Sequence, residues 1–306
     1  MDTQDRSRGC LLGLAVGDAV GTTLEFKSPR SFNPINDMVG GGPFQLKAGE
    51  WTDDTSMALC LATSLVEKNG FDPQDQIDRY CRWWKEGYLS SNGRCFDIGN
   101  AVSDALRRYA KTGDPMAGST NAHSAGNGCI MRLAPVPMFY HPDLAAAVHY
   151  SAESSRTTHG AAECIDACRL LAGIICRALS GASKQEILFG EANSFRAEPK
   201  IAMIARGEYR NKSSDEIRGT GYVVESLEAA LWCFLETDTF EDAILKAANL
   251  GDDADTTAAI CGQLAGAFYS ESAIPRNGPK GLQCDKKLHN SLIAFTKQTN
   301  RTRRAV

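Results

Sequence analysis

The 306-residue sequence lacks any apolar run approaching the roughly twenty residues that a bilayer crossing requires. The apolar stretch CLLGLAV follows a polar, charged N-terminus and is far shorter, so neither a signal peptide nor a membrane anchor is predicted. A strong excess of one charge is also missing. The net charge of -4 gives no broad electrostatic reason to expect nucleic acid or a membrane as partner. A monomer is expected.

Paired cysteine motifs are absent as well. The eleven cysteines are an odd number, they include no CxxC pair, and most fall within apolar helical patterns. This usage predicts reduced thiols in a cytoplasmic protein rather than a disulfide framework. Alternating β-branched strands are likewise missing from the sequence.

Helical periodicity is what the sequence does contain. Asp72 is a natural N-cap before Pro73, and capping boxes are predicted to start helices at Ser183 and Thr239. The predicted fold is all-α, a compact multi-helix bundle forming a single domain over 1–306. Further helices are predicted at about 8–23, 53–68, 98–112, 143–155, 161–180, 222–236, 254–270 and 285–298.

Two segments interrupt the helical pattern. Residues 27–50 and 113–128 are rich in Gly, Pro and small polar residues, and the first is much longer than an ordinary connection. Long segments of this kind are often functional loops, so both are expected to lie near a binding site.

Aspartates gather at two predicted helix starts, in WTDDTSM (51–57) and NLGDDADTTAAI (249–260). One interpretation is helix capping, because Asp and Thr satisfy the free amides of a first turn. The other is a metal site, because five aspartates and four threonines exceed what two caps need. Such a site would offer only hard oxygen ligands, which Mg²⁺, Mn²⁺ and Ca²⁺ prefer, and no Cys or His lies nearby for zinc. Spacing alone leaves both interpretations open.

Six segments taken together resemble the ADP-ribosylglycohydrolase family, and they occur in the family's order over a motif core of about 8–270. They are GLAVGDAVGTTLEF (13–26), WTDDTSM (51–57), FDIGNAV (96–102), SAGNGCIMR (124–132), TGYVVESLEAAL (220–231) and NLGDDADTTAAI (249–260). The resemblance implies an all-helical bundle with two Mg²⁺ or Mn²⁺ ions at the base of a cleft. The ligands it implies are Thr52, Asp53, Asp54, Asp253, Asp255 and Thr256.

The resemblance also suggests residues for catalysis and substrate binding. Asp97 matches a position beside the distal ribose, Glu25 matches a glutamate at the metal site, and Asp54 is the third candidate catalytic residue. Asp252 stands where relatives often have Gly and receives no metal role. The candidate substrate-binding residues are Gly99, Asn100, Ser124, Gly126, Asn127, Gly128, His159 and Tyr222. Helix capping by Asp97, a structural His159 and a core Tyr222 are the alternative interpretations of three of these residues.

The implied activity is metal-dependent hydrolysis of the N-glycosidic bond between ADP-ribose and a protein side chain, with arginine as the expected linkage. The implied partner is a mono-ADP-ribosylated protein or an ADP-ribose adduct. Three alternatives stay open: hydrolysis of O-linked ADP-ribose such as serine adducts or O-acetyl-ADP-ribose, a non-catalytic ADP-ribose binder, and a metal phosphoesterase acting on the diphosphate.

Overall fold

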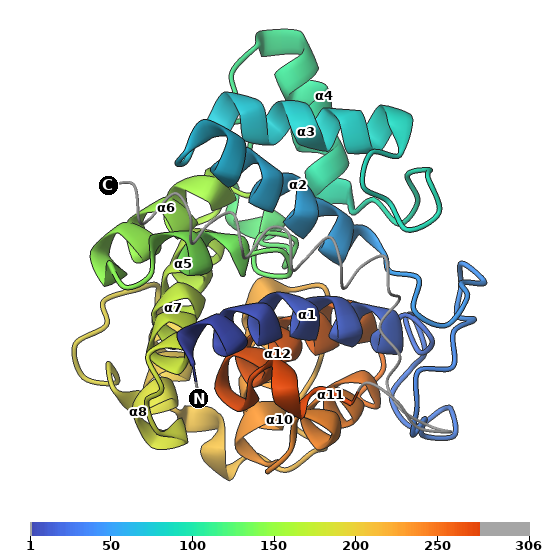
Figure 1. Cartoon of the computed structure of the whole chain (residues 1–306), viewed down its shortest axis with the longest axis vertical. Helices are drawn as coiled ribbons and strands as arrows, with labels where there is room; N and C mark the ends of the chain where they lie inside the picture. The colour runs from blue at the N-terminus through green and yellow to red at the C-terminus, as the bar shows by residue number, and fades with distance from the viewer. Residues whose placement is uncertain (1, 276–306) are drawn as a thin grey trace.

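The computed structural model describes residues 2–275. Within that range the regular secondary structure consists of helices (Figure 1). The prediction of an all-α fold is confirmed. The predicted helix at 285–298 lies outside the described residues. The helices are α1 (Thr3–Gly21), α2 (Asp53–Lys68), α3 (Pro73–Glu86), α4 (Asn100–Thr112), α5 (Pro135–Tyr140), α6 (Leu144–Arg156), α7 (Ala162–Leu179), α8 (Lys184–Phe189), α9 (Pro199–Ala205), α10 (Val223–Leu235), α11 (Phe240–Ala248) and α12 (Ala254–Tyr269), with short 3-10 turns at Ala122–Ser124, Glu208–Asn211 and Glu271–Ala273.

The predicted helix starts are confirmed by their hydrogen bonds. The Asp72 carboxylate accepts the Asp75 N–H at 3.0 Å at the start of α3. Ser183 and Glu186 form a complete capping box at the start of α8. The Thr239 hydroxyl accepts an amide of the first turn of α11. These local signals therefore fixed where the helices begin.

Helices α1 and α12 cross in contact at the centre of the molecule (Figure 1). Small residues on each helix meet in antiparallel order, so Gly13 lies against Gly262 and Gly17 against Ala258. A Cβ at Gly13 would stand only 2.1 Å from the Gly262 carbonyl oxygen. The small residues of the first helix thus allow a backbone approach that side chains would prevent. This approach brings the end of α1 beside the start of α12.

We expect Gly17→Ala to destabilise the protein by roughly 2–4 kcal/mol, because overpacking against fixed backbone cannot be relieved by rotamer changes. The added Cβ would lie 2.1 Å from the Ala258 carbonyl oxygen. Urea unfolding of the variant tests this. Gly173→Ala in α7 is the control, because its Cβ would first meet the flexible end of Arg177 at 3.4 Å. Equal stabilities of the two variants would contradict the packing argument.

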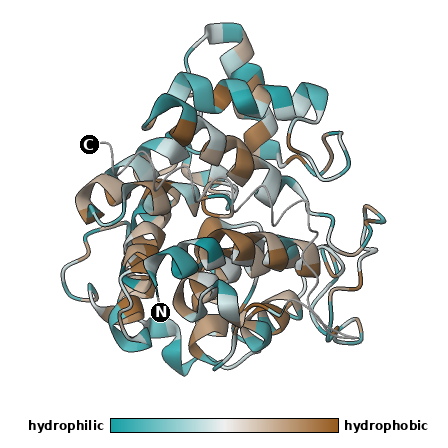
Figure 2. Cartoon of the chain, viewed as in Figure 1, coloured by the Kyte–Doolittle hydropathy of each residue, from teal (hydrophilic) through white to brown (hydrophobic). Residues whose placement is uncertain are grey.

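The buried apolar residues form one large cluster and two smaller ones. Helices α1, α7, α10, α11 and α12 contribute to the large cluster, α2, α3 and α4 to the second, and α2 and α5 to the third. Figure 2 shows the apolar residues of these helices in brown. On α3 the buried stripe runs through Ile77, Tyr80 and Trp83. Cys81 and Trp84, which the periodicity placed on the same face, are half-buried.

Two further predictions can be compared with the described residues. No disulfide joins any of the ten cysteines between residues 2 and 275, as expected for reduced thiols. None of the helices in that range has both the length and the apolar character that crossing a membrane demands.

The segment from 22 to 52 contains no helix and connects α1 to α2 at the right of Figure 1.

Candidate metal centre and substrate cleft

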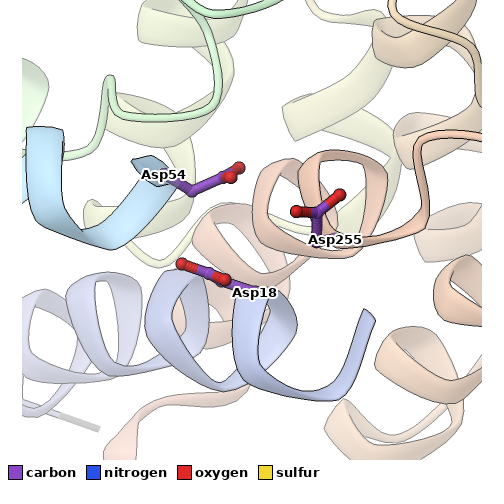
Figure 3. A group of neighbouring side chains, drawn as sticks. All are labelled: Asp18, Asp54 and Asp255. Carbon is purple, nitrogen blue, oxygen red and sulfur yellow. The ribbon is translucent and has the colours of Figure 1, made fainter. Parts of the chain in front are cut away.

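The two aspartate clusters, some 200 residues apart in sequence, meet in space. Asp54 lies in the first turn of α2 and Asp255 in the first turn of α12. Their carboxylates converge with that of Asp18 near the end of α1 (Figure 3). Ligand oxygens of these three residues lie within 4.8 Å of one another. The close crossing of α1 and α12 produces this convergence.

Thr52 lies at the centre of the cluster. Its hydroxyl oxygen is 3.1 Å from Asp54 Oδ2 and 3.3 Å from Asp255 Oδ2. Asp54 and Asp255 are almost completely buried, yet Oδ1 of each has no hydrogen-bond partner in the described part of the chain. An orphaned, buried carboxylate oxygen is costly unless a cation neutralises it.

Asp18 holds the start of α2 in place through hydrogen bonds to two threonines. Its Oδ1 accepts the amide and the hydroxyl of Thr52 at 2.9 and 2.8 Å, and its Oδ2 accepts the amide and the hydroxyl of Thr55 at 3.0 and 2.6 Å. Both oxygens of Asp18 are therefore occupied, although Asp18 lies close enough to Asp54 to be a ligand. The Thr52 hydroxyl can donate its proton to Asp18, which leaves an oxygen lone pair for a cation.

The same contacts argue against the capping interpretation. Thr52 and Asp253 occupy the N-cap positions of α2 and α12, but neither side chain bonds to an amide of its own helix. Asp18, from a different helix, provides the cap of α2. The carboxylates of the two clusters are therefore not used for capping.

Burial and mutual repulsion act on the whole cluster. Burial, reinforced by the neighbouring carboxylates, raises the pKa of Asp53, Asp54 and Asp255 well above the usual range. Burial also raises the pKa of Asp253 and Asp18, against hydrogen bonds that lower it. A divalent cation would reverse these shifts, because it attracts every carboxylate that now repels its neighbours.

Glu25 and Asp97 stand together at one side of the cluster. With Asp255 they form a second group whose ligand oxygens lie within 4.8 Å of one another. Burial and then repulsion by Asp97 raise the pKa of Glu25 to about 10. Burial and then repulsion by Asp253 raise the pKa of Asp97 to about 7. Asp97 does not cap α4, where Gly99 is the N-cap, and its φ of 57° is unusual for a residue with a side chain.

Asn127 contacts Asp253. Its Nδ2 donates to Asp253 Oδ2 at 2.6 Å and to the Ser226 hydroxyl at 3.2 Å. The amide thus orients a candidate ligand from a loop 126 residues away in sequence. Thr256, the other candidate ligand of α12, is buried and lines the cleft.

The glycines of the SAGNG loop pack over His159. A Cβ at Gly128 would lie 2.9 Å from His159 Cε1, and a Cβ at Gly126 would lie 3.5 Å from Nε2. Burial lowers the pKa of His159 to about 4, so its ring is neutral. The ring packs against both glycines and thereby supports the loop. Both glycines were predicted to be substrate-binding residues. The structure gives them this second role.

The backbone of the same loop is largely paired. The amides of Ser124, Gly126 and Asn127 donate to the carbonyls of Asn121, Ser124 and Gly221. Free amides are found instead in the first turn of α4, which packs against this loop. There Gly99 is the N-cap without a side-chain cap, and both Gly99 and Asn100 line the cleft. The start of a helix favours an anion.

A polar network that sequence reasoning missed lies at the rim. The Tyr222 hydroxyl donates to Glu163 Oε2 at 2.6 Å and accepts from Lys200 Nζ at 2.8 Å. All three residues line the cleft. Glu163 and Lys200 carry no motif, and each is an ordinary charged residue at a helix start, so no sequence signal could have identified them.

Asp252 has a structural task outside the metal cluster. Its Oδ2 accepts from Arg218 Nη2 at 3.1 Å. Its backbone exchanges two hydrogen bonds of 2.7 Å with Phe26 and Lys27. It therefore fixes the start of the 27–50 segment against α12, which accounts for the third carboxylate of NLGDDADTTAAI.

The cleft above the cluster encloses about 1440 Å³, and Asp53, Asp253, Asp255 and Thr256 line it. Buried carboxylate and hydroxyl oxygens that lack enough partners are the donor set that a hard divalent cation requires, so these residues fit such an ion. The molecule is thus an all-helical protein with a candidate cation centre at the base of a large cleft.

The family model described as ADP-ribosylglycohydrolase matches residues 1–303, and the chain belongs to this family. It is 52% identical to the ADP-ribosylarginine hydrolase Tri1 of Pseudomonas putida (strain GB-1), over 89% of this chain and 72% of that protein. The protein of the same name from Serratia proteamaculans (strain 568) is 46% identical, over 90% and 74% of the two chains. A solved structure described as an ADP-ribosylglycohydrolase-related protein complex superposes with a TM-score of 0.84 at 40% identity, covering 97% of this chain and 99% of the other.

Proposed function

We propose that the protein is an ADP-ribosylarginine hydrolase that uses two Mg²⁺ or Mn²⁺ ions to cleave the N-glycosidic bond and release ADP-ribose. The observation that carries this proposal is the convergence of Asp54 and Asp255, whose orphaned oxygens need a cation, at the base of the cleft. The names of the relatives at 52% and 46% identity support arginine as the linkage.

The ligands in this proposal come from the two helix starts. Asp53 and Asp54 with Thr52 serve on α2, and Asp253 and Asp255 with Thr256 serve on α12. Bound there, the ions would supply Lewis-acid polarisation and a fixed orientation for the ribose hydroxyls and a water molecule. Asp18 and Asn127 hold Thr52 and Asp253 in position.

Asp97 acts on the reacting atoms, and Glu25 positions it. The transition state carries positive charge on the ribose ring, and carboxylates at the base of the cleft stabilise that charge. Asp97, which lines the cleft beside the acidic cluster, takes a proton from the attacking water and returns it to the departing guanidine nitrogen. Glu25 lies beside it and fixes its orientation.

The rest of the cleft binds the ADP portion of the substrate. The start of α4 at Gly99 and Asn100 provides free amides for the diphosphate. Ser124, Gly126 and Gly128 shape the adjacent part of the wall, over His159. The half-buried ring of Tyr222 lines the cleft and is a surface on which the adenosine part can stack.

Product analysis tests the proposed function. The purified protein is incubated with a peptide carrying ADP-ribose on arginine in the presence of Mg²⁺, and the released nucleotide is identified by mass spectrometry. Intact ADP-ribose is the expected product. AMP with ribose phosphate would identify a phosphoesterase instead. A parallel peptide modified on serine tests the O-linked alternative, and binding without any product would indicate a non-catalytic ADP-ribose binder.

A further inference from the structure

Phe26 has an unusual position. It is 67% exposed, more than any other large apolar side chain in residues 2–275. Its φ of 60° is one that bulky residues rarely adopt, because the Cβ then crowds the backbone. Hydrogen bonds of 2.7 Å between the backbone of Asp252 and those of Phe26 and Lys27 hold this conformation. A strained backbone that displays an apolar ring to water indicates a functional constraint.

The ring lies at the reacting end of the cleft. Phe26 follows Glu25 directly and lines the cleft with it. Phe44 meets it edge-on, with ring centres 6.5 Å apart and planes at 73°, and Phe44 in turn lies 5.2 Å from Phe96, the neighbour of Asp97. Phe44 therefore links the chain neighbours of Glu25 and Asp97, which are Phe26 and Phe96. The Phe44 and Phe26 rings are close to perpendicular, so Phe44 supports the Phe26 ring without a parallel stack.

Charge along the cleft favours a cation at this end. Among the described residues that line the cleft, carboxylates are numerous, and Lys200 is the one Lys or Arg side chain. Lys200 is held by Tyr222 and Glu163 in the rim network. No permanently cationic side chain contacts the Phe26 ring within the described residues.

We propose that the Phe26 ring stacks on the guanidinium group of the ADP-ribosylated arginine and thereby selects arginine linkages over neutral ones. This inference rests on the proposed function. A guanidinium that carries ribose keeps its positive charge, is planar and is weakly hydrated, so it stacks well on an aromatic face. Serine and acetyl groups are neutral and gain no such attraction.

The location of the substrate's positive charge during the reaction determines whether loss of the Phe26 ring changes KM or kcat. Arginine is cationic in the bound substrate and again in the product, once Asp97 has returned the proton to its nitrogen. In the transition state the positive charge is shared between the guanidine and the ribose at the same end of the cleft, so the attraction to the ring is present in the substrate complex and in the transition state alike. Losing it weakens substrate binding without slowing the chemical step. Phe26 is therefore a specificity residue whose loss should appear in KM and not in kcat.

The test compares Phe26→Leu with Phe26→Tyr. Leu keeps an apolar side chain without a π face, and Tyr keeps the face. We expect Phe26→Leu to raise KM for ADP-ribosylarginine roughly 3- to 30-fold with kcat unchanged, and Phe26→Tyr to remain near the wild-type value. Val39→Ala, which trims another exposed apolar side chain of the 27–50 segment, is the matched control and should leave KM unchanged.

Binding of free ADP-ribose, which has no guanidinium, provides a second measurement. Its Kd should be the same for the wild type and Phe26→Leu, which also shows that the variant folds. An unchanged KM in Phe26→Leu, or a KM and an ADP-ribose Kd that rise together, would overturn the inference while leaving the proposed function intact. Failure of the wild type to hydrolyse the arginine linkage would instead reject the proposed function, and this inference with it.

Discussion

Asp255→Asn is expected to lower kcat/KM for ADP-ribosylarginine by roughly a thousand-fold, since a cation ligand and its Lewis-acid contribution of several kcal/mol are lost together. The Asp255 carboxylate is buried, lies 3.3 Å from the Thr52 hydroxyl and has one oxygen without a partner in the described chain. Release of ADP-ribose under saturating Mg²⁺ measures the loss. Asp78→Asn, which removes an exposed carboxylate on α3 outside the cleft, is the control.

The same substitution should have the opposite effect on the stability of the metal-free protein. In EDTA, Asp255→Asn removes one of several buried carboxylates that repel one another, so the melting temperature should rise. The wild type should gain more stability from Mg²⁺ than the variant, because an ion that binds only the folded protein stabilises it by mass action. A variant that is inactive and also less stable in EDTA would point to misfolding and contradict this account.

The sequence contained enough information for the helix starts and for the existence of the acidic centre. Aspartate and threonine at positions 52–55 and 252–257 are too many for two caps, and the glycine and alanine stripe of α1 indicated a close helix contact. Both signals are local. The partner of that stripe, α12, could not be read from local patterns, because the matching small residues are more than 230 positions away.

The contacts that support the centre could not be predicted from the sequence. A charge among the small residues of α1 suggested that Asp18 supports the metal ligands, but nothing in its neighbourhood shows that it caps α2 from outside. Asn127 belongs to a Gly-rich loop and was predicted to bind substrate, yet its side-chain amide holds Asp253. Such hydrogen bonds depend on how distant segments pack, and residue spacing carries no information about that.

The stability of the metal-free protein should fall as the pH rises from about 4 to about 7. In the folded protein the pKa of Asp97 is raised to about 7 and that of Glu25 to about 10, above their ordinary values of 3.8 and 4.5. Between the ordinary and the raised value the folded state therefore binds more protons than the unfolded state. Linkage then requires stability to decrease with pH across that window, a loss that begins near pH 4 and, for Glu25, continues beyond pH 7.

Mg²⁺ should reverse this trend, because the ion competes with protons for the same carboxylates. The increase in melting temperature caused by Mg²⁺ is expected to be small at pH 5 and large at pH 8, and scans at a series of pH values in Mg²⁺ or EDTA measure it. Asp97→Asn removes one titrating group and should flatten the EDTA curve between pH 4 and 7. If the Mg²⁺ effect is equally large at pH 5 and pH 8, then protons and cations do not share these carboxylates, and the centre lies elsewhere.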